Sequence, residues 1–262
     1  MFALTNDDLR LRIVGCGDGP ASFNAEASRR GANVISCDPI YRWEASQIRE
    51  RILSTYDEML EQTRRNADEF VWSSIRSVEE LGQVRMATMQ TFLDDFASGK
   101  LAGRYLEAEL PTLPFADASF DLGLCSHFLF LYTTQLGDVF HRSAILEMCR
   151  VATEVRIFPL LALGGQQSPY VHENLDHLRA LGFDATVVKV PYEFQRGGDY
   201  MMQIRTARTA GEHRLGGVAP TGPVRSCRRA CGSSRPLAAE RRIQRPSRIL
   251  GIGRADVQRR NE

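Results

Sequence analysis

The chain has 262 residues, of which 43% are hydrophobic and 25% charged, and its formal net charge is +1. This length can bury one sizeable core, and no apolar run approaches the roughly 20 residues that a membrane helix needs. The N-terminus lacks the basic and then apolar pattern of a secretion signal and the six cysteines are scattered, so we expect a cytoplasmic protein without a membrane partner or a disulfide framework.

The first predicted elements are a strand, a glycine-rich turn, a helix and a second strand. Residues 9–14, LRLRIV, form the first strand, and the turn GCGDG follows at residues 15–19. Pro20 is placed where a first helical turn tolerates proline, because the N–H that it lacks would be unpaired there. Gly31 ends the helix, and residues 33–37 form the second strand. This order is the first half of a doubly wound α/β fold.

The glycine turn and the acid after the second strand form the first candidate site. Glycine lets a backbone turn tightly and lets a ligand approach bare N–H groups without a Cβ in the way. Asp38 lies 19 positions beyond Gly19, where its carboxylate can accept hydrogen bonds from both hydroxyls of a ribose. This arrangement predicts an adenosine-bearing cofactor. The cofactor-binding candidates here are Gly15, Cys16, Gly17, Gly19, Asp38 and Pro39.

The spacing of the glycines bears on the identity of that cofactor. The dinucleotide pattern G-x-G-x-x-G would need a third glycine at position 20, which is Pro20, so the NAD interpretation is weakened. The segment VGCGDGPA, followed by SCDPIY, instead resembles the first two motifs of class I S-adenosylmethionine-dependent methyltransferases. Residues 109–121, ELPTLPFADASFD, resemble a third stretch of the same family.

The resemblance to class I methyltransferases covers residues 9–207 and implies a cofactor with defined contacts. S-adenosylmethionine would place its amino acid end on the glycine turn and its ribose on Asp38. Glu109 would face the adenine amine, at a position where that family more commonly has aspartate, and Leu110 would offer its backbone to the ring. Turn and cap geometry alone is the alternative explanation for these residues.

The elements after residue 109 continue in the order of that family's core. We expect strands at residues 120–125 and 154–161, helices near 138–150 and 171–181, and a closing strand pair at 185–193 and 199–204. The resemblance implies a doubly wound, mostly parallel seven-stranded sheet whose last strand is antiparallel. Residues 150–154, RVATE, depart from the family's turn because they contain neither proline nor glycine.

Residues 41–104 form an insertion after the second strand, where the family's core needs only a short helix and a loop. Apolar residues recur there at helical spacing in two stretches, so we expect two helices. These residues are Ile48, Ile52, Leu53, Tyr56, Met59 and Leu60, and then Val84, Met86, Met89, Phe92, Leu93 and Phe96. The helices would form either a lid over the cofactor, with Trp43 and Trp72 lining a substrate pocket, or plain packing with both tryptophans in the core.

The catalytic candidates follow the fourth strand, at the edge where open α/β sheets bind ligands. In SHFLFLY, residues 126–132, His127 is the candidate general base, and local hydrogen bonding or packing is the alternative role. Ser126 is a further cofactor-binding candidate. His141 and Cys125 are interpreted as structural. A rim for a polar substrate is one hypothesis, and a hairpin the other, for Tyr192, Glu193, Gln195 and Arg196.

Residues 208–262 differ in composition from the rest of the chain. They hold 13 Arg, 4 acidic residues and no Phe, Trp or Tyr, so their net charge of +9 leaves −8 for residues 1–207. Such a segment cannot offset its ordering entropy by burial, so we expect a basic disordered tail. A translation running past a frameshift would look the same. A nucleic-acid arm and a metal site at Cys227 and Cys231 are the alternatives.

These observations together predict an S-adenosylmethionine-dependent methyltransferase that acts on a small molecule by in-line transfer. No metal site is expected in the domain. Residues 126–129, SHFL, lack the motif that accompanies methylation of nucleobase amines, and an acidic core is a poor partner for nucleic acid. Three alternatives stay open: a non-catalytic nucleoside-binding protein of the same fold, an NAD-dependent oxidoreductase, and an RNA-interacting methyltransferase that uses the basic tail.

Overall fold

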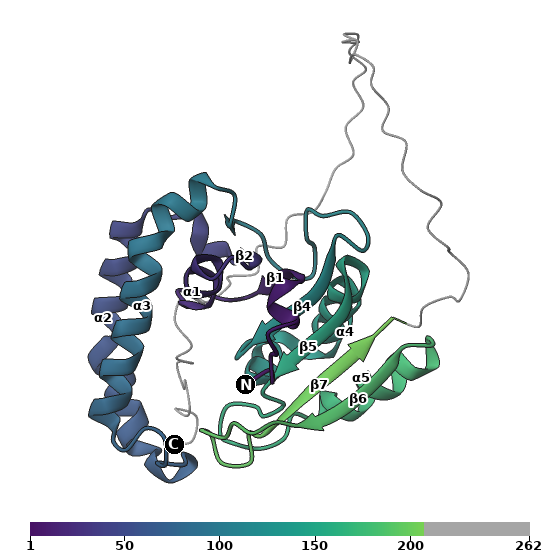
Figure 1. Cartoon of the computed structure of the whole chain (residues 1–262). Helices are drawn as coiled ribbons and strands as arrows, with labels where there is room; N and C mark the ends of the chain where they lie inside the picture. Colours follow the sequence, from purple (N-terminus) through teal and green to yellow (C-terminus); the bar gives the residue numbers. More distant parts are fainter. Residues whose placement is uncertain (207–262) are drawn as a thin grey trace, which may run out of the picture. The chain divides into compact units, whose positions relative to one another are not determined.

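One sheet of seven strands organises residues 1–206, the part of the chain that the computed structural model describes (Figure 1). The strands follow the order β3-β2-β1-β4-β5-β7-β6, and all pairs are parallel except those of β7 with β5 and with β6. They are β1 (Arg12–Cys16), β2 (Asn33–Cys37), β3 (Tyr105–Leu106), β4 (Phe120–Ser126), β5 (Ala152–Phe158), β6 (Asp184–Lys189) and β7 (Tyr200–Arg205). The predicted fold class is confirmed, whereas the expected tail, with Cys227 and Cys231, lies outside the described residues.

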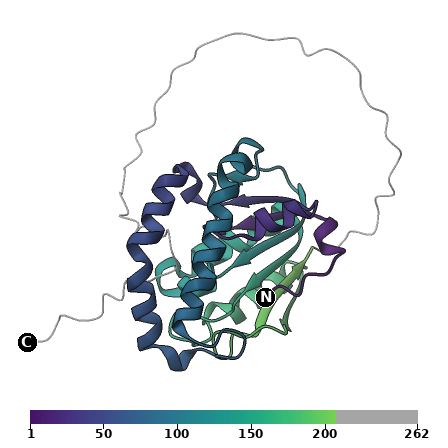
Figure 2. The same ribbon diagram turned by 60° about the vertical axis from the view of Figure 1, so that its left-hand side comes forward.

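Helices connect these strands within residues 1–206. The α-helices are α1 (Phe23–Arg29), α2 (Ala45–Arg65), α3 (Val78–Leu101), α4 (Thr133–Val151) and α5 (Tyr170–Ala180). The 3₁₀-helices are η1 (Asp8–Arg10), η2 (Pro39–Arg42), η3 (Ala67–Glu69) and η4 (Phe130–Tyr132). None of these helices is long and apolar enough to cross a membrane. Figure 2 shows α2 and α3 running side by side, as two helices of one insertion.

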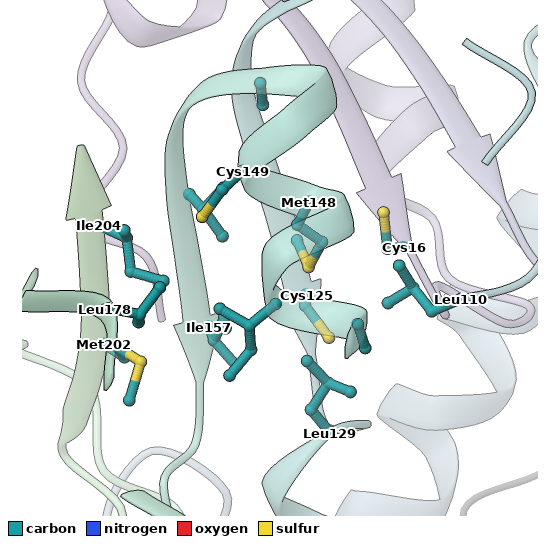
Figure 3. Close-up of a cluster of buried hydrophobic side chains, with 14 of the residues drawn as sticks. Cys16, Leu110, Cys125, Leu129, Met148, Cys149, Ile157, Leu178, Met202 and Ile204 are labelled. Carbon is teal, nitrogen blue, oxygen red and sulfur yellow. The ribbon is translucent and has the colours of Figure 1, made fainter. Parts of the chain in front are cut away.

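Each face of the sheet carries its own hydrophobic core, as expected for parallel strands that are covered on both sides. On one face, Cys16 and Cys125 lie under α4, where Met148 packs in the same buried cluster (Figure 3). On the other face, Leu124 of β4 shares a cluster with Ala27 of α1. Cys125 is a fully buried free thiol, so its structural interpretation is confirmed.

The N-terminal segment differs from the prediction of a strand over residues 9–14. Residues Asp8–Arg10 form η1, and β1 begins only at Arg12. The cause is a buried ion pair, because Arg156 of β5 holds Asp8 at 3.0 Å and also donates to the Phe2 carbonyl at 3.1 Å. The Asp8 carboxylate accepts the Thr5 N–H at 2.8 Å as well. These contacts fix a turn where periodicity alone predicted extended backbone.

Two helix boundaries also differ from their predicted positions. The helix α1 begins at Phe23, about one turn after Pro20, because the backbone at Gly19 (φ +58°) turns toward the end of β2 instead. The helix α4 begins at Thr133, is kinked at Gly137 (φ +71°), and runs directly into β5 at Ala152. The sequence RVATE therefore needs no turn, which explains why it lacks the family's proline and glycines.

The insertion is rooted on one edge of the sheet by a cluster of aromatic rings. Tyr41 of η2, Phe92 and Phe96 of α3, and Tyr105 of β3 pack with ring centroids 5.0–5.9 Å apart. All four side chains are buried, so this root is dry and well packed. Trp43 is 38% exposed, and the interpretation of Trp43 as a core anchor is wrong.

The far end of the insertion contacts the loop between β6 and β7. The Val71 N–H donates to the Phe194 carbonyl at 2.7 Å, and the Arg196 N–H donates to the Glu69 carbonyl at 2.7 Å. The rings of Phe70, Trp72 and Phe194 pack with centroids 5.0–5.8 Å apart. We call these contacts the tip contact. Because β2 and β6 both end at the same edge of the sheet, the insertion joins two distant points of the carboxyl edge.

Candidate functional site

The glycine turn and the acid after β2 meet directly. The Gly19 N–H donates to Asp38 Oδ2 at 2.9 Å, and the Ile40 N–H donates to Asp38 Oδ1 at 2.9 Å. The Gly17 N–H donates to the Cys37 carbonyl at 2.9 Å, which ties the turn to the end of β2. The Tyr41 hydroxyl donates to the Gly19 carbonyl at 2.8 Å. The sequence candidates at the ends of β1 and β2 thus form one cluster, with Pro39 opening η2 beside it.

Two of the glycines are required by their surroundings. Gly17 has φ +71°, and a Cβ there would lie 2.8 Å from Cδ1 of Phe128, too close for any real contact. A Cβ on Gly15 would overlap the carboxylate of Asp18. The side chain of Cys16 is buried in the core, so only its backbone could meet a ligand. The turn is therefore shaped by close packing on both of its flanks.

The third predicted stretch brings Glu109 and Leu110 to the same region. The Leu110 side chain is buried in the core, and among residues 1–206 no acceptor takes its N–H. Glu109 is exposed, and its charge contributes to raising the pKa of Asp38. Arg150 supports this stretch by donating to the Leu113 carbonyl at 3.2 Å and the Phe115 carbonyl at 2.8 Å.

Two carboxyl groups at the turn have raised pKa values. Burial raises the pKa of Asp18 to about 7, against a hydrogen bond from the Ser36 hydroxyl at 2.6 Å, and the Asp38 charge adds to the increase. Burial also raises the pKa of Asp38 to about 6, although two backbone N–H groups stabilise its ionised form. Asp18 points inward, and it was not predicted as a site residue because the sequence marks it only as part of a turn.

Asp18→Asn is expected to flatten the pH dependence of stability. The folded pKa of this carboxyl is raised from 3.8 to about 7. Its protonated form therefore makes its full contribution to the free energy of unfolding below pH 4, and that contribution is lost as the pH rises to 7. Because one pKa unit corresponds to about 1.4 kcal/mol, wild type should lose on the order of 2–4 kcal/mol relative to the variant between pH 4 and pH 8. Urea unfolding at both pH values measures this, and parallel losses in the two proteins would contradict the assignment.

His127 and Ser126 lie at the carboxyl end of β4. The backbone of His127 is left-handed (φ +50°), a conformation that few non-glycine residues adopt, and its N–H donates to the Phe158 carbonyl at 2.7 Å. Ser126 Oγ lies 2.8 Å from His127 Nδ1. The residue is exposed, yet burial by the surrounding protein lowers the pKa of His127 to about 4.

The other sequence candidates occupy different places. His141 is fully buried, with Nδ1 2.6 Å from the Gly137 carbonyl and Nε2 2.9 Å from the Leu129 carbonyl, so its structural interpretation is confirmed. Tyr192 packs on Phe158 with ring centroids 5.9 Å apart, next to His127. Glu193, Gln195 and Arg196 instead hold the β6–β7 loop and its contact with the insertion.

The strand order, the antiparallel β7 and a glycine turn that meets an acid after β2 define the class: the chain has the Rossmann-like fold of class I methyltransferases. No protein-family model matches the sequence. The chain belongs to the same family as uncharacterized protein MJ0045 of Methanocaldococcus jannaschii. The two are 33% identical over 206 residues, which is 78% of this chain and 90% of that protein.

Solved structures that are similar to this chain share little sequence with it. Magnesium protoporphyrin IX methyltransferase of Synechocystis PCC 6803, solved with bound SAH, is 12% identical and gives a TM-score of 0.43 over 75% of this chain and 74% of its own. A SAM-dependent methyltransferase of Aquifex aeolicus is 14% identical and gives a TM-score of 0.37 over 74% and 80%. The fold class therefore stands on the strand order and not on these superpositions.

Proposed function

We propose that the protein is a methyltransferase that uses S-adenosylmethionine as cofactor and a small molecule as methyl acceptor. The charge of the turn carries this proposal. Asp18, Asp38 and Glu109 belong to this region, and within residues 1–206 no basic side chain contributes to the pKa of Asp18 or Asp38. The carboxylates of Asp18 and Asp38 favour a ligand that bears sulfonium and ammonium charges, and they repel the pyrophosphate of a dinucleotide.

The residues present fit this cofactor. A carboxylate offers about four lone-pair positions, and Asp38 uses one on each oxygen, so capacity remains for two ribose hydroxyls. The N–H of Leu110 suits a ring nitrogen of adenine, and the carboxylate of Glu109 suits the adenine amine. Gly15, Cys16, Gly17 and Gly19 would receive the amino acid end, with Ser126 beside it.

When bound, the cofactor supplies an activated methyl group on sulfur. The chain's own residues would orient the acceptor, exclude water and take a proton where the acceptor must lose one. The pKa of His127, lowered to about 4, keeps its imidazole neutral near pH 7 with a lone pair available, and it also makes that imidazole a weak base. If the Ser126 hydroxyl donates to Met1 Sδ, 3.7 Å away, then Nδ1–H of His127 donates to Ser126 and Nε2 keeps its lone pair.

We further propose that the insertion, residues 41–104, acts as a lid over this site. It is rooted beside Asp38, through Tyr41, and the tip contact joins it to the β6–β7 loop at the other side of the carboxyl edge. Between these points the helix α3 brings Arg85 close enough to lower the pKa of His127. A lid in this place would exclude water from methyl transfer.

Isothermal titration calorimetry of the full chain with S-adenosylhomocysteine and with NAD tests the cofactor. We expect saturable binding of S-adenosylhomocysteine and none of NAD. Binding of NAD alone would support the oxidoreductase and end this proposal. Tight S-adenosylmethionine binding without methyl incorporation from a metabolite extract would instead favour a nucleoside-binding protein, and incorporation into RNA alone would favour the RNA-interacting alternative.

His127→Asn is expected to lower the rate of methyl transfer about 100-fold or more while leaving S-adenosylhomocysteine affinity within twofold of wild type. The variant removes the imidazole lone pair but keeps a side chain that can stay near Ser126. Transfer of labelled methyl to the acceptor fraction measures the rate, and His172→Asn on the exposed face of α5 is the matched control. Equal rates in the two variants would assign His127 a packing role.

A further inference from the structure

The buried histidine His141 makes hydrogen bonds to two carbonyl oxygens. Nδ1 lies 2.6 Å from the Gly137 carbonyl, on the same helix α4, and Nε2 lies 2.9 Å from the Leu129 carbonyl. A carbonyl oxygen can only accept, so each ring nitrogen must carry a proton to bond to it. In a neutral imidazole one nitrogen has a lone pair instead, and this lone pair would face one of the two oxygens with no proton between them. The two contacts therefore indicate a doubly protonated ring with a positive charge.

The rings around His141 suit a cation. The side chain is fully buried, and the rings of Phe130 in η4 and Tyr170 in α5 lie with their centroids 5.6 and 4.9 Å from that of the imidazole. An aromatic ring can attract a cation within about 6 Å of its centroid. Two carbonyl oxygens and two aromatic rings thus offer partial negative charge to an imidazolium at this place.

The charged groups on α4 and on the elements packed against it are paired with one another or reach solvent. Asp138 and Arg142, beside His141 on α4, pair at 3.0 Å. Tyr132 of η4 packs on Phe128 instead, with ring centroids 6.4 Å apart. The other groups are Glu147 paired with Arg150 on α4, Asp121 with Arg12 at β4, Glu154 with Arg156 at β5, and His172, Glu173, Asp176, His177 and Arg179 at the surface of α5. The contacts of His141 itself are therefore the two carbonyls and the two rings.

The Leu129 carbonyl belongs to the loop that follows β4 and carries the catalytic candidate His127. In the same loop, the Phe128 ring packs on the glycine turn, since a Cβ on Gly17 would lie 2.8 Å from it. The His127 N–H fixes the start of the loop by its bond to β5, and the bond from His141 fixes its end at Leu129. His141 is thus connected to both parts of the candidate site, the catalytic residue and the cofactor turn.

We propose that His141 is a positioning residue: its protonated ring holds the loop of residues 127–129 in place for cofactor binding, and loss of one proton releases that loop. This inference rests on the proposed function. The bond to Gly137 is the shorter of the two, so the remaining proton stays on Nδ1 and the bond to Leu129 is lost. Phe128 then loses its fixed position against the glycine turn. The site is therefore assembled in the protonated protein and loosens as the pH rises.

Nuclear magnetic resonance of the full chain labelled with ¹⁵N-histidine tests the charge of His141. The chain has five histidines, and substitution of the other four assigns His141 by elimination, even if a variant of His141 itself does not fold. We expect both ring nitrogens of His141 to carry protons at pH 5.5. One protonated and one unprotonated nitrogen at that pH would show a neutral ring and overturn the proposal.

Hydrogen exchange of the ligand-free chain tests the positioning role. In wild type, the protection of the backbone amides of residues 127–132, corrected for the intrinsic exchange rate, should fall about two- to tenfold between pH 5.5 and pH 8.5, because one hydrogen bond is lost. His141→Gln keeps a neutral amide donor in reach of Leu129, so its protection should not change over this range. His172→Gln, on the exposed face of α5, should behave as wild type. Identical pH profiles in wild type and His141→Gln would overturn the proposal.

Calorimetry with S-adenosylhomocysteine connects this role to the site. The affinity of wild type divided by that of His141→Gln should fall about two- to tenfold over the same pH range. The ratio is used because Asp18 and Asp38 titrate in both proteins. A constant ratio would show that the loop does not position the cofactor and would overturn the proposal. Absence of binding to both proteins at every pH would end the proposed function, whereas the exchange profiles, which need no ligand, would still decide whether His141 holds the loop.

Discussion

Asp38→Ala is expected to weaken the binding of S-adenosylhomocysteine by about 10- to 100-fold. The carboxylate would lose its bonds to the ribose, and the N–H groups of Gly19 and Ile40, now held at 2.9 Å, would lose their acceptor. A hydrogen bond to a charged group contributes about 1.5–3 kcal/mol, and about 1.4 kcal/mol is tenfold in affinity. Calorimetry at pH 8 measures the effect, because the pKa of Asp38 is about 6 and the carboxylate is ionised there.

The variant Asp38→Asn is the control for shape. It keeps one oxygen acceptor at the same distance from the backbone, so its loss of affinity should be smaller than that of Asp38→Ala. Wild-type affinity should also fall as pH decreases through about 6, where Asp38 takes up a proton, and the affinity of Asp38→Asn should not follow that change. Undiminished binding by Asp38→Ala would remove the residue from the site.

Gly17→Ala is expected to lower the free energy of unfolding by about 2–4 kcal/mol. Its φ of +71° costs a residue with a Cβ about 1–2 kcal/mol, and the overlap with Phe128 adds a similar amount. Gly19→Ala is the matched control, since Gly19 has φ +58° but open space around its Cβ position, so only the backbone cost of about 1–2 kcal/mol applies. Urea unfolding at pH 5 gives both values.

The contribution of Phe128 can be isolated with a double-mutant cycle. Phe128→Leu should recover part of the loss in the Gly17→Ala background, while the same change in the Gly19→Ala background should recover none. Equal losses in Gly17→Ala and Gly19→Ala, without coupling to Phe128, would show that the ring moves aside freely and that the turn is less tightly packed than the distances indicate.

The parts of the fold that were predicted well depend on residues that lie close together in the sequence. About 30 residues contain the glycine turn, the two apolar runs on either side of it and the acid after the second run. The contact predicted between the turn and the acid is present, since the Gly19 N–H donates to Asp38. The two helices of the insertion follow from apolar spacing alone, although Val84 turned out to be exposed and Val78 and Leu81 buried. Periodicity gave the presence of each helix, and packing decided its buried face.

The parts that were missed depend on contacts between distant segments. The tip contact joins Val71 to Phe194, and nothing in the sequence of either segment indicates that it contacts the other. Arg156 fixes the turn at Asp8 in the same way, from 148 residues further along the chain. Such contacts arise only when the sheet brings the segments together, so one sequence cannot supply them.

Asp18 was missed because a turn residue can point inward or outward with the same sequence. Only the folded turn shows that its carboxylate accepts a hydrogen bond from the Ser36 hydroxyl.

The attachment of the insertion at two points has a consequence for turnover. An element fixed at one end swings open as a flap, whereas a lid attached at two points, as proposed above, would first have to release the weaker of its two ends. The root is a buried aromatic cluster, while the tip is held by two backbone hydrogen bonds, two hydrogen bonds from the Arg196 side chain at 3.3 Å and three rings, so we expect the tip to detach first. Ligand entry, product departure and solvent exchange of the Val71 and Arg196 amide protons would then share one gating event, and its frequency would set the upper limit on the catalytic rate.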